Sequence, residues 1–286
     1  MEDQGTRKIL DIKITSTTTK EVLENIKSFL LSDSQHRIIT LNPEMVMEAQ
    51  KDSYFKKIIN ESDLSLADGI GIVFANLLIN REILPERTRG VDLIYKICGS
   101  DFAEKTNVYL IGAGEGIAER AAKALAKEYP YLQIVGAEEG IRFEMSNVKC
   151  QMSNEFQNSN EKSKKVSLFE KRGLRRISEK SAEYNGLNKQ LIQRINNAQP
   201  DIIFVAFGAP KQEKWIYENI KKIPSVKLAI GVGGSFDFIS GKVKRAPLIL
   251  RKIGLEWLWR LMLEPRRIGR IFNATVKFGL LILKNK

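Results

Sequence analysis

The sequence predicts an α/β fold, with a Rossmann-like, mostly parallel sheet, helices on both of its faces and a basic helical appendage at the C-terminus. Short β-rich runs alternate with longer helical stretches, which is typical of a layered α/β domain. Most of the later β-rich runs are continuously apolar, as expected for parallel strands that are covered on both faces. An excess of Lys and Arg after residue 240 predicts the appendage.

The elements follow one another in a regular order. Helical patterns between the strands include residues 18–33 and 116–130, and the second ends at Pro130, as expected near a helix C-terminus. The predicted strands are short runs rich in β-branched and aliphatic residues, at 8–14, 37–41, 63–67, 107–112, 132–137, 201–208 and 226–234.

Residues 144–185 interrupt this alternation. They are rich in Ser, Asn and Lys and show no sustained hydrophobic period, which predicts an inserted, flexible surface loop. We therefore expect a catalytic α/β domain over residues 1–240, which contains this loop, and an appendage over residues 241–286.

Positive charge is concentrated in the appendage. The chain has a formal net charge of +12, and residues 242–286 hold twelve Lys and Arg against two Glu. Such a basic segment suits a phosphate-bearing partner, which could be a nucleic acid, an anionic lipid or a diphosphate substrate.

The cysteines and the N-terminus fit a protein of a reducing compartment that carries no secretion signal. Cys98 and Cys150 lie far apart without a CxxC spacing, which fits a reducing compartment and argues against a disulfide framework or a zinc site. The N-terminal residues include no apolar stretch of the kind that a secretion signal needs.

Polar residues follow four of the predicted strands. The carboxyl ends of parallel strands share one edge of a sheet, where ligands bind in open α/β folds. Each motif alone is equally a turn or a helix cap, and Asp68 is a candidate general base or a turn residue. Together they suggest one pocket, formed by TLNPEM (40–45), SLADGIGI (65–72), AFGAPKQEKWI (206–216) and GVGGSFDFISGKVKRAP (231–247).

A glycine-rich turn, IGAGEG (111–116), lies between a strand and a helix. Gly112 and Gly114 could cradle a phosphate or could form a tight turn, and the sequence leaves both interpretations open. The dinucleotide fingerprint would need a third glycine where Ile117 stands, so a nicotinamide cofactor is the less expected ligand.

Several chemistries find no support in the sequence. His36 is the single histidine and lies at a predicted strand start, which leaves no Ser-His-Asp or Cys-His pair and no histidine metal cluster. No Asp-x-Asp pair is available to hold a divalent ion against a nucleotide-sugar diphosphate. We therefore expect no metal and no cofactor, with other cations stabilising any phosphate leaving group.

The appendage combines basic and large apolar residues. Pro265 should divide it into two helices, the first of which carries Trp257 and Trp259. Arg267, Arg270 and Lys277 share one helical face. An adjacent face carries Ile268, Phe272, Thr275 and Ile282. This pattern fits an element that lies on a membrane surface, and equally a helix pair that docks on the domain. Its longest apolar run is far short of the ~20 residues that span a bilayer.

These motifs together resemble the WecG/TagA/CpsF family of bacterial glycosyltransferases, glycosyltransferase family 26. The resemblance runs from about Ile9 to Arg270 and is interrupted by the 144–185 loop, which the family does not lead us to expect. It rests on six motifs in order: TLNPEM, LADGIGI, PERTRGVDL, AFGAPKQEKWI, GVGGSFDFISGKVKRAP and LEWLWRLMLEPRR.

The resemblance implies a metal-independent inverting transferase at the inner face of the cytoplasmic membrane. In the branch that makes the wall teichoic acid linkage, N-acetylmannosamine passes from UDP-N-acetylmannosamine to undecaprenyl-diphospho-N-acetylglucosamine. A related branch uses UDP-N-acetylmannosaminuronic acid, and the motifs do not separate the two donors. The implied protein is peripheral to the membrane, needs no cofactor, binds no nucleic acid and could form a homo-oligomer.

The resemblance also implies roles for particular residues. Asp68 matches the catalytic base of the family and Thr40 its polar partner. Positions for the nucleotide or the sugar match Asn42, Arg87, Gln212 and Asp237, and the arginines of the family's C-terminal appendage match Arg260, Arg267 and Arg270.

Two interpretations from other classes remain at this stage. The turn that contains Gly112 and Gly114 could belong to an NAD-dependent oxidoreductase. The basic C-terminal segment could instead mark a non-enzymatic protein that binds membranes or nucleic acid, with a steeply salt-dependent affinity for DNA.

Overall fold

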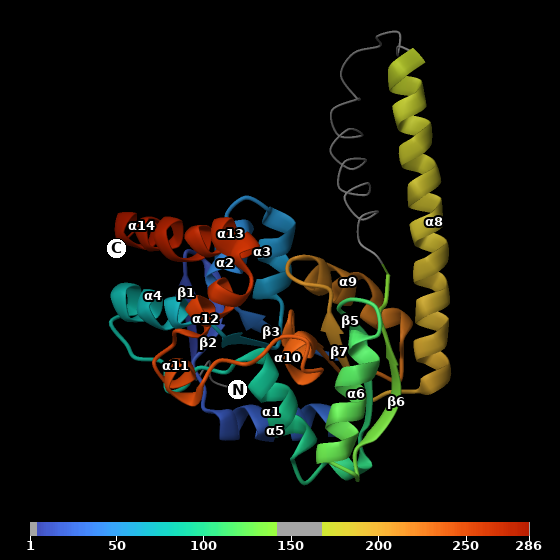
Figure 1. Ribbon diagram of the computed structural model, residues 1–286, viewed down its shortest axis with the longest axis horizontal. Helices are drawn as coiled ribbons and strands as arrows, with labels where there is room; N and C mark the ends of the chain where they lie inside the picture. The colour runs from blue at the N-terminus through green and yellow to red at the C-terminus, as the bar shows by residue number, and fades with distance from the viewer. Residues whose placement is uncertain (1–4, 142–167, 286) are drawn as a thin grey trace.

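The computed structural model describes residues 5–141 and 168–285 (Figure 1). The side chains of 168–181, Arg267 and Arg270 lie outside this description. The centre of the fold is a six-stranded sheet in the order β4-β3-β8-β7-β5-β6, and every neighbouring pair of strands is parallel. The predicted parallel α/β sheet is therefore confirmed. Its strands are β3 (His36–Leu41), β4 (Leu64–Ala67), β5 (Asn107–Gly112), β6 (Gln133–Glu138), β7 (Ile202–Ala206) and β8 (Leu228–Gly231).

Alternate residues of the strands enter apolar clusters on opposite faces of the sheet. In β3, for example, Ile38 belongs to one cluster and Ile39 to another. This two-sided burial explains why the strands are continuously apolar in sequence. One face is covered by α1 (Thr19–Leu31), α5 (Gly90–Cys98), α6 (Ile117–Glu128) and α10 (Ser235–Ile239). The other is covered by α2 (Pro43–Ala49), α3 (Ser53–Asn60), α4 (Ile70–Asn80), α8 (Leu168–Ala198) and α9 (Lys211–Asn219).

The N-terminal strand differs from the prediction. Residues 8–14 do not form one strand, because β1 (Thr6–Ile9) and β2 (Ile12–Thr15) pair as an antiparallel hairpin. Leu10 and Asp11 form its two-residue turn with φ of 51° and 61°. Two consecutive positive φ values suit the twist of a tight hairpin. The sequence pattern does not predict this turn, because leucine is rarely found at its first position.

The predicted loop over residues 144–185 is also wrong in part. Helix α8 begins at Leu168, so residues 168–185 are helical. The remainder of the predicted loop falls on residues that lie outside the described part of the chain.

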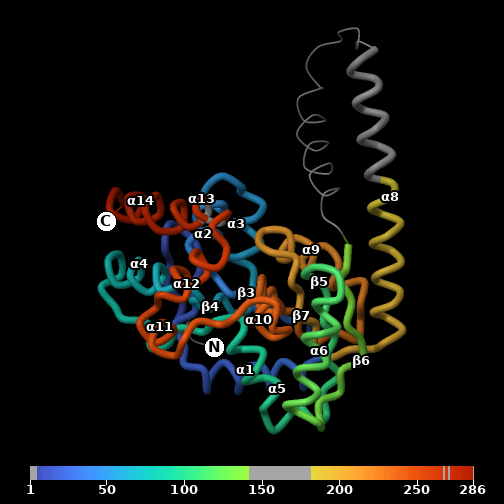
Figure 2. Tube along the Cα trace, in the orientation of Figure 1, coloured from blue at the N-terminus to red at the C-terminus, as the bar shows by residue number. Residues whose placement is uncertain are grey.

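The appendage is a series of short helices, and Pro265 separates them as predicted. In the described chain, Phe278 and Ile282 are buried in the same apolar cluster as residues of α2 and α4. Figures 1 and 2 show the last helix lying beside α4. The elements are α11 (Leu248–Lys252), α12 (Glu256–Leu263), a turn at Pro265–Arg267, α13 (Ile268–Phe272), the π-helical segment η5 (Asn273–Lys277) and α14 (Phe278–Lys284).

Candidate active site

A cavity of about 820 Å³ opens at the carboxyl edge of the sheet. Residues that follow β3, β4, β7 and β8 line one side of it, and residues of the appendage line the other. The predicted site residues that it brings together are Thr40, Asn42, Asp68, Arg87, Gln212, Asp237 and Arg260.

Thr40 and Asn42 line the cavity at the end of β3. The Thr40 hydroxyl is buried and donates a hydrogen bond to the Gly231 carbonyl, 2.9 Å away, which joins β3 to β8. Asn42 is the N-cap of α2, as the sequence predicted, and its side-chain oxygen accepts from the Met45 amide at 3.1 Å. Both side chains therefore fix the turn that ends β3.

Asp68 follows β4 and lines the cavity. Its backbone amide donates to the Leu41 carbonyl at 2.9 Å, which keeps the two strand ends together. Burial raises the pKa of Asp68 to about 7, and the negative charge of Glu256 acts in the same direction. The positive charges of Arg87 and Arg89 oppose this rise in pKa. A carboxyl group with a pKa near neutral pH is suited to accept a proton from a substrate hydroxyl.

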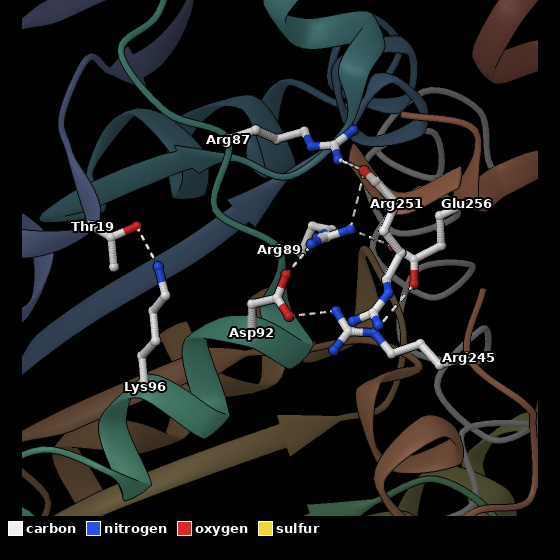
Figure 3. Close-up of polar contacts among 8 residues, drawn as sticks. All are labelled: Thr19, Arg87, Arg89, Asp92, Lys96, Arg245, Arg251 and Glu256. Carbon is white, nitrogen blue, oxygen red and sulfur yellow. Dashed lines mark hydrogen bonds and ion pairs between the residues drawn. The ribbon is translucent and has the colours of Figure 1, made fainter. Parts of the chain in front are cut away.

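Four charged side chains join the catalytic domain to the appendage (Figure 3). We call this cluster of Arg89, Asp92, Arg245 and Glu256 the ion-pair ring. Arg89 donates to Asp92 at 2.5 Å and to Glu256 at 3.0 Å. Arg245 in turn donates to both Asp92 and Glu256. Because each arginine bridges both carboxylates, the ring links α5 to the start of α12.

Arg87 makes a second link beside this ring. Its guanidinium donates to the backbone carbonyl of Arg251 at 2.6 Å (Figure 3). Burial lowers the pKa of Arg87, and neighbouring Arg89 adds to that effect. A partly buried guanidinium of this kind is a suitable partner for a phosphate group that enters the cavity.

Gln212 connects two of the strand-end turns. Its side-chain oxygen accepts from the Gly208 amide at 3.1 Å and from the Gly233 amide at 3.0 Å. Its side-chain nitrogen donates to the buried carboxylate of Glu213 at 2.6 Å. Burial raises the pKa of Glu213 to about 7. The Glu213 carboxylate thus fixes which way the Gln212 amide points.

Asp237 meets the appendage at the far side of the cavity. It accepts from Arg260 at 3.4 Å and from Lys242 at 3.2 Å. The Arg260 guanidinium also lies 4.8 Å from the centre of the Phe238 ring, in a cation–π contact, and donates to Glu264 at 2.8 Å. Arg260 is therefore held in place before any ligand arrives.

The glycine-rich turn has a clear packing role. Gly112 has a φ of +113°, and a Cβ at this position would lie 2.6 Å from the Ala206 carbonyl carbon. Only a glycine allows this approach between β5 and β7. Gly112 and Gly114 are not part of the cavity lining, whereas Ala113 between them is.

Two predicted residues lie outside the description of side chains, and three residues at or beside the cavity were not predicted. The side chains of Arg267 and Arg270 lie outside the described residues, so their roles stay predictions. Arg89, Glu213 and Glu256 were not singled out from the sequence. Each one nevertheless lies within a motif that carries the family resemblance, and Arg89 and Glu256 line the cavity.

The cavity does not coincide with a preformed metal site in the described chain. No group of three or more His, Cys, Asp or Glu residues there is arranged to hold a metal ion. Nor does any described helix have both the length and the apolar character needed to cross a bilayer.

A cavity at the carboxyl edge of a parallel sheet is where open α/β folds bind their ligands, and this one is lined by a carboxylate and several arginines. A comparison with protein families identifies the class of protein. The model of the "Glycosyl transferase WecG/TagA/CpsF family" matches residues 7–161 and 172–286. The chain therefore belongs to this family and is a glycosyltransferase. Between its two segments the match leaves out residues 162–171, which lie within the predicted 144–185 loop.

Curated relatives agree with this assignment. Proteins from Staphylococcus aureus strains MRSA252 and NCTC 8325 / PS 47 are each 29% identical over 270 residues. The match covers 94% of this chain and 89% of each relative. Both are named N-acetylglucosaminyldiphosphoundecaprenol N-acetyl-beta-D-mannosaminyltransferase. Family membership decides against the oxidoreductase and the non-enzymatic interpretations.

Proposed function

We propose that this glycosyltransferase moves N-acetylmannosamine from UDP-N-acetylmannosamine to undecaprenyl-diphospho-N-acetylglucosamine with inversion. The observation that carries the proposal is that Asp68 lines the same cavity as Arg87, Arg89 and Arg260. Burial, which raises the pKa of Asp68 to about 7, supports its role. The names of the relatives support this donor sugar and this acceptor. The runner-up donor within the family is UDP-N-acetylmannosaminuronic acid.

Asp68 is the general base in this mechanism. Its carboxylate takes the proton of the acceptor hydroxyl while the hydroxyl oxygen attacks the anomeric carbon of the donor. A new carbon–oxygen bond forms, the bond from that carbon to the diphosphate breaks, and UDP leaves. Because the oxygen attacks from the face opposite the leaving group, the configuration at that carbon inverts.

Arginines stabilise the leaving diphosphate. Arg87 and Arg260 line the cavity from its two sides, and guanidinium groups match phosphate oxygens in geometry and charge. Arg267 and Arg270 are proposed to contribute in the same way. With this positive charge in place the reaction needs no divalent metal ion, so EDTA should leave the rate unchanged. A loss of activity that magnesium or manganese restores would contradict this mechanism.

The remaining predicted residues bind the donor. Asn42, Gln212 and Asp237 lie around the same cavity and are proposed to contact the nucleotide or the sugar. Thr40 supports Asp68 by holding the end of β3 against β8. Gly112 and Gly114 are proposed to shape the turn that presents Ala113 to the ligand.

We also propose that the enzyme acts at the inner face of the cytoplasmic membrane, with the appendage lying on the lipid surface. The appendage is basic and bears exposed large apolar side chains, a combination suited to an anionic bilayer surface. Examples from four of its segments are Ile249, Met262, Phe272 and Leu280.

The direct test measures UDP release from UDP-N-acetylmannosamine with and without a short-chain lipid-diphospho-N-acetylglucosamine. Wild type should release UDP only when the acceptor is present. Asp68→Asn should still bind UDP but should lose about 10²- to 10⁴-fold in turnover, as expected when a general base is removed. Unchanged turnover in Asp68→Asn would remove Asp68 as the base. Release from the uronic-acid donor alone would favour the related branch.

A further inference from the structure

The cavity has two chemically distinct ends. Its polar end contains Asp68, Arg87 and Arg260. Its other end is walled by α2 and α4 of the catalytic domain and by η5 and α14 of the appendage. We call this second end the apolar arm. The apolar side chains that line it include Met45, Phe74, Leu78, Ala274, Phe278 and Ile282.

The apolar arm offers few polar groups to a ligand. Among its described lining residues, Glu44 belongs to the first turn of α2, and Thr275 donates its hydroxyl to the Ile271 carbonyl at 2.8 Å. Contact between water and these apolar walls is unfavourable in free energy. An apolar ligand that displaces this water would therefore bind favourably.

The arm continues into exposed apolar surface. Phe74 lines the cavity and is still 58% exposed, so it lies at an opening. The same two helices, α4 and α14, carry exposed Leu77, Leu280 and Leu283. Figures 1 and 2 show that these helices lie side by side. The apolar lining of the cavity is therefore continuous with the exposed apolar surface of α4 and α14.

We propose that the apolar arm binds the first isoprenyl units of the lipid acceptor, next to its diphosphate. This inference rests on the proposed function, in which the polar end holds a diphosphate-linked sugar. A polyprenyl diphosphate has the same order of parts as the cavity: an anionic head that suits the arginines and an apolar chain that suits the arm. The appendage thus forms half of the lipid site as well as a contact with the membrane.

Gly279 allows the arm to be blocked without disturbing the fold. This residue of α14 lines the cavity, and a Cβ added to it would meet no atom within 4 Å. Leucine is also a better helix former than glycine, so Gly279→Leu should leave α14 stable. Gly269→Leu is the matched control, because Gly269 in α13 has equally open surroundings and does not line the cavity.

The experiment compares the binding of farnesyl diphosphate and inorganic diphosphate by isothermal titration calorimetry. Wild type and Gly269→Leu should bind farnesyl diphosphate at least about tenfold more tightly than diphosphate, as expected for partial burial of an isoprenyl chain. Gly279→Leu should lose this preference and keep its affinity for diphosphate.

Three results would overturn the proposal: no preference in wild type, an intact preference in Gly279→Leu, or an equal loss of preference in both variants. This binding measurement requires no turnover. A farnesyl preference that depends on Gly279, in a protein that releases no UDP from either donor, would keep the lipid site and reject the proposed transfer reaction.

Discussion

The two sides of the cavity are held by different kinds of contact. The strand-end side is buried within the sheet framework, where Thr40 and Gln212 join neighbouring strand ends through hydrogen bonds. The appendage side is joined by the ion-pair ring and by the buried side chains of Phe278 and Ile282. Between these attachments, α12 and α13 expose large apolar groups to solvent.

This difference indicates that the strand-end side and the appendage have different roles in the site. The proposed base belongs to the rigid sheet edge, so its position is set when the domain folds. The charge that tunes this base, and the wall that encloses it, come from the appendage, because Glu256 raises the pKa of Asp68. Changes on the strand-end side should therefore alter global stability, and changes in the appendage should alter activity more than stability.

The largest effect is expected from removing the appendage after Ser240. Transfer should fall at least about 100-fold, because Arg260 no longer stabilises the leaving group. The sheet should stay folded by circular dichroism, although the loss of buried Phe278 and Ile282 should lower Tm. A fully active truncated protein would contradict the proposed role of the appendage in activity.

Glu213→Gln tests the prediction that changes on the strand-end side alter the stability of the whole protein. Burial raises the pKa of Glu213 to about 7 in the folded protein from an ordinary value of 4.5, so the folded state holds this proton over a wider pH range. Wild-type stability therefore falls as pH rises from about 4.5 to about 7, by about 3 kcal/mol from this group. The variant lacks this decline, so its stability relative to wild type should increase across that window.

The measurement for Glu213→Gln is urea unfolding at pH 5 and at pH 8. Glu218→Gln is the control, because Glu218 is an exposed carboxylate on the same helix. Equal stability differences at the two pH values would show that Glu213 does not titrate between them. The affinity for UDP should also weaken in Glu213→Gln, because the Gln212 amide loses the carboxylate that orients it.

Arg245→Ala tests the ion-pair ring. Asp92 and Glu256 would each lose one of their two arginines, which should loosen α12 and reduce transfer about tenfold, a cost of about 1.4 kcal/mol. Global Tm should change little. Arg245→Lys should restore activity in part, because it keeps the charge and loses the two-pronged geometry. Lys244→Ala is the control, and an equal loss of activity there would refute a specific role for the ring.

The smallest effect is expected from single exposed residues of the appendage. Met262→Ser removes an apolar side chain that is 69% exposed, and it should weaken binding to anionic vesicles about fivefold. Leu31→Ser is the matched control, since Leu31 is 83% exposed on α1, outside the appendage. A vesicle co-sedimentation assay that gives equal losses for both variants would argue against membrane contact by α12.

The sequence predicted which residues come together at the strand-end side of the cavity, and their roles stay predictions. Parallel strands bring their carboxyl ends to one edge, so polar residues after four strands identified Asn42, Asp68 and Gln212 without any knowledge of distances. The sequence also predicted the asparagine N-cap of α2 and the helix end before Pro265, because each depends on local backbone chemistry.

The sequence could not show contacts between distant segments. The ion-pair ring joins Arg89 and Asp92 to Arg245 and Glu256, more than 150 residues away, and no periodicity predicts such a pairing. The turn at Leu10 and Asp11 was missed because its first residue is not a typical turn former. The helix from Leu168 was missed because its polar sequence has only a weak apolar stripe.

The most direct test of the central claim is the pH dependence of kcat/KM for sugar transfer by wild type and by Glu256→Gln, with Glu218→Gln as control. Wild-type activity should fall as pH drops through about 7, where Asp68 takes up its proton. In Glu256→Gln this fall should occur at lower pH, because a negative charge that raises the pKa of Asp68 is gone and Arg87, Arg89 and Asp92 remain. A wild-type profile that falls near pH 4, or a profile that Glu256→Gln does not shift, would contradict the account.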